Sequence, residues 1–194
     1  MSTSASWCTC AMATRMCASA LQSGGSWLNS GARSLYFFIM HIVLVEPEIP
    51  PNTGNVARLC AATGTRLHLI EPFGFKLDDK QLKRAGMDYW RQVTWHRWKN
   101  WTAFAEKVPA DAQLWFIESG GGKNYAEVKF AANDYLVFGR ETAGLPKQLL
   151  EQYRENWLRI PMFNAESRSL NLSNCVALVL FEALRQQGFV EELH

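Results

Sequence analysis

From residue 40 onward, short runs rich in Ile, Val and Leu alternate with longer segments whose apolar residues recur every three or four positions. The short runs are typical of strands buried on both faces of a sheet, and the longer segments are typical of amphipathic helices. This alternation predicts an α/β fold with a mostly parallel sheet and helices on both faces. The expected strands cover residues 41–45, 66–70, 92–95, 114–117, 135–138 and 158–160. The expected helices are one capped by Asn52 or Thr53 and ended by Gly64, then 79–85, 98–107, one opened by Pro146, and 170–187.

The first 39 residues differ from the rest of the chain. They contain eight serines, no Asp or Glu, and only two charged residues, Arg15 and Arg33. No periodic pattern continues there long enough to define a helix, so we expect this segment to be poorly ordered and the folded domain to cover residues 40–194. An acid-free segment with Ser and Arg is also typical of an organellar transit peptide, and an extension ahead of a true start at Met40 is the alternative.

Composition narrows the class of protein but not its task. The chain has 194 residues, of which 48% are hydrophobic, and a formal net charge of +2. These proportions are typical of globular proteins, and no apolar window reaches the roughly 18 residues of a membrane span. The five cysteines form no CxxC pair and have no histidine at metal-ligand spacing. We therefore expect a cytoplasmic protein with free thiols, no metal and no membrane segment.

Candidate chemistry lies in three loops that follow predicted strands, because ligands of open α/β sheets bind beyond the carboxyl ends of the strands. These loops are 50–55, which leads to Arg58, then 138–146 and 160–174. Each key residue of these loops also has an ordinary explanation. Gly139 and Gly144 can be simple turn residues, Ser169 and Asn171 can cap the last helix, and Arg58 can be a solvated helix side chain. Together, however, the glycines and the free backbone N–H groups favour a neutral heteroaromatic ring bound by main-chain groups.

Other familiar sites are not indicated by the sequence. Residues 119–123, Ser-Gly-Gly-Gly-Lys, lack the GxxxxGK[ST] spacing of a phosphate loop and are predicted to form a flexible loop. No GxGxxG follows the first strand, which argues against a dinucleotide site. His68 and His96 lie in or beside strand patterns, and we expect them to be structural.

Three segments carry a resemblance to a known family: PEIPPNTGNVARLCAATG, YLVFGRETAGLP and RIPMFNAESRSLNLSNCVALVLFEALRQ. They resemble the three motifs of the SPOUT superfamily of RNA 2′-O-ribose methyltransferases. Within that superfamily they are most similar to the TrmL/YibK branch, which modifies the wobble nucleotide of tRNA. The resemblance runs from Met40 to about Gly188, in the order and near the spacing of the family.

The resemblance implies methylation, from S-adenosylmethionine, of the ribose 2′-hydroxyl of a cytidine or modified uridine in the tRNA anticodon. It also implies a homodimer and a C-terminal trefoil knot, an exception to the general absence of knots. The cofactor residues that it implies are Ile117, Gly139, Ile160, Ser169 and Leu170. It implies that Arg58 is catalytic and that the substrate contacts are Asn52, Arg168 and Asn171. The alternatives are a ribosomal RNA methyltransferase of the same fold and a non-catalytic RNA- or nucleotide-binding module.

Basic and aromatic side chains are the candidates for RNA contacts. The basic candidates are Lys76, Lys80, Lys83, Arg84, Arg154 and Arg168, and a solvated helix face explains Lys80 and Lys83 at least as well. We expect most of Trp90, Trp95, Trp98 and Trp101 to lie in the core, with base stacking as the alternative. Arg140 and Ala143 depart from the family pattern in the second motif, and this departure leaves the target nucleotide open.

Overall fold

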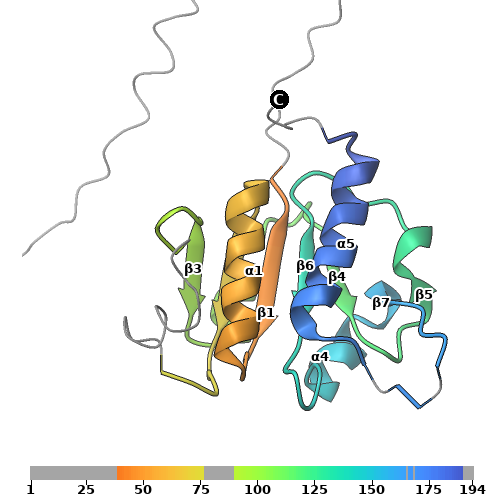
Figure 1. Ribbon diagram of the computed structural model, residues 1–194, viewed down its shortest axis with the longest axis horizontal. Coiled ribbons are helices and arrows are strands. Elements are labelled where there is room, and N and C mark those ends of the chain that lie inside the picture. The colour runs from red at the N-terminus through yellow and green to blue at the C-terminus, as the bar shows by residue number, and fades with distance from the viewer. Residues whose placement is uncertain (1–38, 77–89, 165, 168, 190–194) are drawn as a thin grey trace, which may run out of the picture. The chain divides into compact units, whose positions relative to one another are not determined.

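The computed structural model describes residues 39–76, 90–164, 166–167 and 169–189. The expected helix 79–85, with its three basic residues, and Arg168 lie outside the described residues. Within them, seven strands form one sheet in the order β3-β2-β1-β6-β4-β7-β5, and all paired neighbours run parallel (Figure 1). The strands are β1 (His41–Val45), β2 (Arg66–Ile70), β3 (Trp95–Trp98), β4 (Leu114–Ile117), β5 (Lys123–Asn124), β6 (Tyr135–Phe138) and β7 (Trp157–Arg159).

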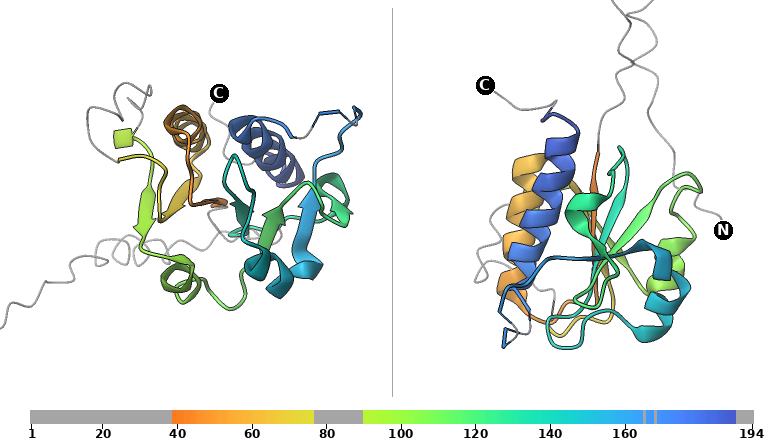
Figure 2. Two further views of the ribbon diagram at one scale, coloured as in Figure 1. Left: turned by 90° about the horizontal axis from the view of Figure 1, so that it is seen from below. Right: turned by 90° about the vertical axis from the view of Figure 1, so that its right-hand side faces the viewer.

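Helices cover both faces of the sheet, as the alternating pattern predicts. The α-helices are α1 (Pro50–Thr63), α3 (Trp101–Ala105), α4 (Lys147–Gln152) and α5 (Leu172–Gln186), accompanied by the 3-10 turns η2 (Tyr125–Glu127) and η3 (Arg154–Asn156). α1 and α5 lie side by side on one face (Figure 1), and α3 and α4 lie on the other (Figure 2). None of the helices in the described ranges is long and apolar enough to cross a membrane. The predicted α/β fold with a parallel sheet is confirmed.

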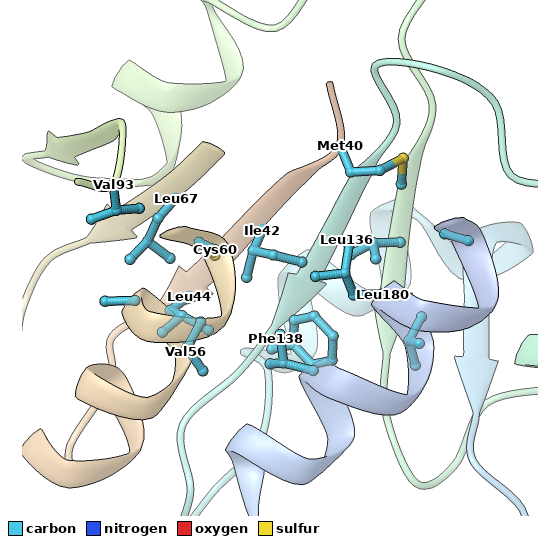
Figure 3. Packing of buried hydrophobic residues seen from close by; sticks show 14 of the residues in the cluster. Met40, Ile42, Leu44, Val56, Cys60, Leu67, Val93, Leu136, Phe138 and Leu180 are labelled. Atoms are coloured by element: carbon cyan, nitrogen blue, oxygen red, sulfur yellow. The ribbon is translucent and has the colours of Figure 1, made fainter. Parts of the chain in front are cut away.

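The strands are apolar on both faces because both faces are covered. Ile42 and Leu44 of β1 point toward the α1 and α5 side, where they pack in one cluster with Val56 (Figure 3). Val43 lies between them in the sequence, points to the opposite face, and packs in a second cluster with Phe104 of α3. Two buried faces therefore explain the near-continuous apolar runs in the sequence.

α1 begins earlier than the sequence predicts. Its first helical residue is Pro50, and its N-cap residue is Ile49, whose side chain makes no capping hydrogen bond. Prolines occupy the first helical positions, where an N–H group has no partner within the helix. The expected cap by Asn52 or Thr53 was wrong, because the helix begins before both residues and their own N–H groups bond to the carbonyl of Ile49 at 3.1 and 3.3 Å. The other end agrees with the prediction, since Gly64 has a φ of 65°.

Several other boundaries differ by one to three residues from their predicted positions. β3 spans Trp95–Trp98 instead of 92–95, because its pairing with β2 sets Trp95 opposite Leu67. α3 starts after Asn100, whose side chain accepts a hydrogen bond of 2.9 Å from the N–H of Ala103. Shifts of one or two residues also occur at the starts of β7, α4 and α5.

The segment 119–123 is packed rather than flexible, which corrects the prediction. Gly121 is buried, and a side chain at this position would collide with the backbone of Leu158 in β7. Lys123 begins β5, which pairs with β7, and its Nζ donates a hydrogen bond of 2.7 Å to the carbonyl of Glu155. Gly121 allows close packing against β7, and the lysine is used within the fold.

Candidate active site

The three loops singled out from the sequence follow β1, β6 and β7, and one carboxylate joins the first two of them. Glu141 Oε2 accepts a hydrogen bond of 2.9 Å from the backbone N–H of Glu48. Glu141 Oε1 accepts bonds of 3.2 Å from the N–H of Ile49 and 3.1 Å from the side-chain amide of Asn52. Glu141 therefore binds the backbone just ahead of α1 and the side chain of Asn52 in the first turn, where a negative charge also interacts favourably with the helix dipole.

Asn52 extends this contact to the third loop. Its Oδ1 accepts a hydrogen bond of 2.9 Å from Nδ2 of Asn171. Asn171 in turn caps α5, because its Oδ1 accepts bonds of 2.9 Å from the N–H and 2.7 Å from the hydroxyl of Ser173. Asn52 is only 6% exposed, and both ends of its amide are bonded, as a buried polar group requires. We call this chain of contacts the Glu141–Asn52–Asn171 network; it brings together two of the three expected substrate residues.

A second set of contacts closes the first loop against the second. The carboxylate of Glu48 accepts hydrogen bonds of 3.2 Å from the N–H of Thr142 and 2.6 Å from its hydroxyl. Arg140, which departs from the family pattern, forms an ion pair with Glu46. Both pairs join residues that are 94 positions apart in the sequence. The two loops are therefore held together by three acidic side chains, counting Glu141.

The second loop also folds back on itself at its two glycines. The backbones of Arg140 and Gly144 form two hydrogen bonds of 3.0 Å. A side chain at Gly139 would collide with the backbone of Gly144 and Leu145, so the loop's own packing requires a glycine there. Gly144 has a φ of 67°, and Glu118 at the end of β4 accepts the N–H of Leu145 at 3.2 Å. Gly144 is thus a turn residue with a positive φ, as the ordinary explanation has it. At position 139 a glycine is required because the backbone of Gly144 and Leu145 comes too close for a side chain.

The expected cofactor residues lie around the ends of β4, β6 and β7. Ile117 ends β4 and Ile160 follows β7, and both are half-buried, whereas Ser169 and Leu170 are exposed just before α5. Together with Gly139 they form an uncharged set. Apolar side chains of the first and third loops are also open to solvent, with exposed fractions of 40% for Ile49, 39% for Met162, 100% for Phe163 and 36% for Leu170. Such a surface suits an uncharged ring with an apolar substituent.

Arg58 lies in α1, eight residues after the first helical residue, and its side chain is exposed. It follows Asn52 by six residues, and at about 100° per residue this separation places the two side chains on different faces of the helix. The structure therefore brings Asn52 to Asn171 but leaves Arg58 on a solvent-facing part of α1.

The other candidates for RNA contacts divide between surface and core. Lys76 and Arg154 are exposed. The four tryptophans are half-buried and pack against the two core clusters, as most were expected to do; these are Trp90, Trp95, Trp98 and Trp101.

Two residues of the site were missed by the sequence analysis, Glu48 and Glu141. The signal for Glu141 lies in the charge pattern. The first turn of α1 contains no acidic residue, so the positive end of its dipole has no charge partner within the helix. Glu141 lies three residues after β6, in a loop at the same edge of the sheet, and provides such a partner.

The described cysteines are not placed to act as nucleophiles. Burial raises the pKa of Cys60 to about 12, and burial also raises the pKa of Cys175. Thiols of this kind are protonated at neutral pH and behave as small apolar side chains. The expectation of free, structural cysteines is confirmed for these two residues.

Comparison with known proteins adds to this geometry. A model of the SpoU rRNA Methylase family matches residues 39–181. A tRNA (cytidine(34)-2′-O)-methyltransferase of Saccharophagus degradans is 54% identical over 154 residues, which make up 78% of this chain and 97% of the relative. A solved structure described as giving structural insights into the 2-OH methylation of C/U34 on tRNA has 43% identity and a TM-score of 0.74, covering 78% of this chain and 98% of that one. An AdoMet-bound rRNA methyltransferase from Sinorhizobium meliloti has 26% identity and a TM-score of 0.67, covering 75% of this chain and 56% of that one.

Proposed function

The chain belongs to the SpoU rRNA methylase family, and from this premise we propose that it methylates the ribose 2′-hydroxyl of nucleotide 34 of tRNA, a cytidine or uridine. The observation that carries this function is 54% identity to a tRNA (cytidine(34)-2′-O)-methyltransferase across 97% of that relative. The ribosomal RNA methyltransferase is 26% identical, and the match covers 56% of its chain. Transfer RNA is therefore the better supported substrate, and the protein is an enzyme rather than a non-catalytic binding module.

S-adenosylmethionine is the methyl donor, and when bound it supplies a sulfonium methyl group that is already activated toward an oxygen nucleophile. The chemistry of the expected residues fits this donor. Ile117, Ile160 and Leu170 offer apolar surface, and Ser169 and Gly139 leave backbone groups within reach of an adenine ring. We assign the binding of the donor to these five residues.

With an activated methyl group, the enzyme must mainly orient the ribose hydroxyl and help to remove its proton. We assign the substrate side of the site to Asn52, Asn171 and Arg168. Asn171 directly follows the proposed cofactor residue Leu170 and bonds to Asn52 at 2.9 Å. Glu141 holds Asn52 in turn. The Glu141–Asn52–Asn171 network therefore supports a fixed spacing between the loop that binds the donor and the helix that carries Arg58.

We assign Arg58 a catalytic role that it performs through contact with the RNA substrate. An isolated arginine is a poor base because its pKa exceeds ~12. Two roles are chemically reasonable: a bidentate fork that holds a phosphate beside the target ribose, or a base assisted by that phosphate. The exposure of Arg58 on α1 supports both, because RNA can reach it from solvent.

A homodimer is the second element of the proposal. α5 packs one side against the sheet, and along its outer side the exposed residues recur at 174, 178, 181 and 185. Leu178 and Phe181 in this row are 42% and 48% exposed. Two exposed large apolar side chains, one turn apart on a helix, favour burial against a further surface, and a second copy would bury them with two-fold symmetry.

The trefoil knot is the third element. β7 lies between β4 and β5 in the sheet, and the chain then returns to α5, which packs beside α1. A late strand inserted between two earlier ones, followed by a return to the other side of the sheet, supports a threaded path. An experimental chain trace of residues 114–189 tests it, and an unthreaded path would contradict the knot.

The test of the function is incubation of the full chain with bulk tRNA and S-adenosylmethionine labelled in the methyl group, followed by nuclease mapping. The expected product carries the label on the 2′-oxygen of nucleotide 34. Calorimetry of donor binding, run in parallel, separates loss of the donor from loss of transfer. Label found only in ribosomal RNA, or no label with folded protein that binds the donor, would overturn the proposal.

A further inference from the structure

Two histidines are buried at the amino edge of the sheet, the edge opposite to the three loops. His41 is the first residue of β1, His68 lies in β2, and each is 5% exposed. His41 Nδ1 and His68 Nε2 are 2.9 Å apart, and the indole N–H of Trp98 donates to His68 Nδ1 at 3.1 Å. Burial lowers the pKa of His41 to about 4 and that of His68 to about 3, so both rings are neutral at pH 7.

The indole of Trp98 determines where the proton sits on each ring. An indole N–H can only donate, so His68 Nδ1 is an acceptor and the single proton of His68 is on Nε2. That proton is donated to His41 Nδ1, which places the single proton of His41 on Nε2. These two hydrogen bonds therefore make His41 Nε2, the ring nitrogen that does not contact His68, a hydrogen-bond donor.

His41 lines a pocket of about 250 Å³. The lining residues that matter here are His41, Arg66, Asp111, Asn133 and Tyr135. Within the described ranges, neither His41 Nε2 nor the Tyr135 hydroxyl has a hydrogen-bond partner, although the residues are 5% and 6% exposed. In the same ranges, Thr53 Oγ1 is the only side-chain nitrogen or oxygen that is fully buried and has no hydrogen-bond partner. His41 Nε2 and the Tyr135 hydroxyl are therefore accessible, and they open onto the pocket.

The charge of the pocket comes from Arg66 and Asp111. The guanidinium of Arg66 makes no hydrogen bond or ion pair in the described part of the chain, and it is close enough to lower the pKa of both histidines. Asp111 is exposed and is the one acidic residue in the lining. The pocket therefore carries one positive and one negative side chain, and the acidic one is the more exposed of the two.

We propose that this pocket binds an oxyanion, a phosphate or carboxylate group, held by the Arg66 guanidinium, the His41 Nε2–H and the Tyr135 hydroxyl. Donors that open onto a pocket and have no partner within the protein are available to a ligand, and an anionic acceptor bonds to them more strongly than a neutral one. The site is separate from the three loops, since a five-residue strand spans roughly 16 Å. The ligand is either a free small anion or a backbone phosphate of RNA, and the chemistry of recognition is the same for both.

The test is long-range 1H–15N NMR of the histidine rings in the full chain at pH 7. Before ligand is added, His41 and His68 should both show the neutral tautomer with the proton on Nε2. Addition of inorganic phosphate should shift His41 Nε2 in a saturable way. A tautomer of His68 with its proton on Nδ1, or no saturable shift at His41, would overturn the proposal.

Variants separate the pocket from general charge effects. Arg66→Gln should weaken phosphate binding by about tenfold or more, and Asp111→Asn should strengthen it, because a repulsive charge is removed. Arg91→Gln, an exposed arginine outside the lining, is the control. Trp98 does not line the pocket, so Trp98→Phe removes no contact with the ligand. It removes the hydrogen bond that fixes the tautomer of His68 and should weaken phosphate binding a few-fold. Equal effects of Arg66→Gln and Arg91→Gln would overturn the site.

The source of the anion follows from a second titration. If an RNA phosphate is the ligand, a short RNA oligonucleotide shifts His41 Nε2 in the same direction as inorganic phosphate. If a free anion is the ligand, phosphate shifts this signal and the RNA leaves it unchanged. Both results support the oxyanion site, and neither depends on the methyl-transfer assay.

Discussion

At the scale of single residues, Asn52 carries the contact between the first and third loops. Its amide donates to Glu141 at 3.1 Å and accepts from Asn171 at 2.9 Å. A carboxylate at position 52 would have nearly the same shape. It would lose the donor, however, and would set a second negative charge beside Glu141. The amide chemistry of this position, and not its size, is therefore what the site depends on.

We expect Asn52→Asp to lower the free energy of unfolding by about 1–3 kcal/mol, because a buried donor is lost and two carboxylates face each other. The rate of methyl transfer should fall with it, since α1 loses its side-chain contact with Glu141 of the second loop. Chemical denaturation and single-turnover kinetics measure the two effects. Asn55→Asp, on an exposed position of the same helix, is the matched control, and a loss of similar size there would contradict the assignment.

Arg58 tests the role of guanidinium geometry. Arg58→Lys keeps the charge but loses the bidentate fork, so we expect kcat to fall by about 10- to 100-fold while the affinity for S-adenosylmethionine stays unchanged. Single-turnover methylation of tRNA and calorimetry of donor binding measure these quantities. Arg91→Lys, another exposed arginine, should have no such effect. Nearly full single-turnover activity of Arg58→Lys would remove Arg58 from the catalytic step.

The buried histidines predict how stability depends on pH. Burial lowers the pKa of His41 from 6.5 to about 4 and that of His68 from 6.5 to about 3. Below pH 6.5 the two histidines therefore bind protons in the unfolded chain but not in the folded chain. The free energy of unfolding is thus at its full value above pH 6.5 and falls as the pH drops toward 4. The slope should reach up to about 1.4 kcal/mol per pH unit for each histidine. Urea denaturation between pH 7 and pH 5 measures it, and His41→Phe should make the slope shallower; an unchanged slope would show that His41 does not titrate in this way.

At the scale of elements, the second loop depends on glycine in two different ways, and Gly144 gives the sharper test. Its φ is 67°, and an added side chain would meet the carboxylate of Glu118. We expect Gly144→Ala to destabilise the protein by about 1–3 kcal/mol through backbone strain and loss of the Glu118 contact. Thermal denaturation measures this loss. Gly120→Ala, where an added side chain meets nothing, is the control and should be nearly neutral.

Four of the seven described strands could be predicted with their bounds because their cause is local. β1, β2, β4 and β6 have the predicted bounds, since apolar side chains on both faces leave a continuous signal. The contact of Glu141 with the start of α1 could not be predicted, because Glu141 is 92 residues away from Ile49 in the sequence. The same is true of the active site: the three loops were identified from their residue types, but the acidic side chains that join them act across long separations.

At the scale of the whole molecule, the arrangement of α1 and α5 leaves one helix surface to be explained. α5 covers the sheet with Val176, Val179 and Ala183, as its periodicity predicts, and these residues are fully buried. Leu178 and Phe181 belong to the opposite side of the same helix. Sequence periodicity identifies a core-facing side, but it does not distinguish a second apolar side that meets another protein from one that meets water. The physical argument for a dimer therefore comes from exposure in the folded chain.

A charge on this outer side of α5 provides the test of the dimer. Phe181→Glu should shift the full chain from dimer to monomer, because a carboxylate would have to be buried without a partner at the interface. Light scattering after size-exclusion chromatography measures the mass, and circular dichroism confirms that the variant is folded. Thr102→Glu, an exposed position on α3 at the other face of the sheet, controls for the added charge. A folded Phe181→Glu variant with the mass of the unmodified protein would show that this row is not the dimer contact, and a monomeric unmodified protein would reject the dimer itself.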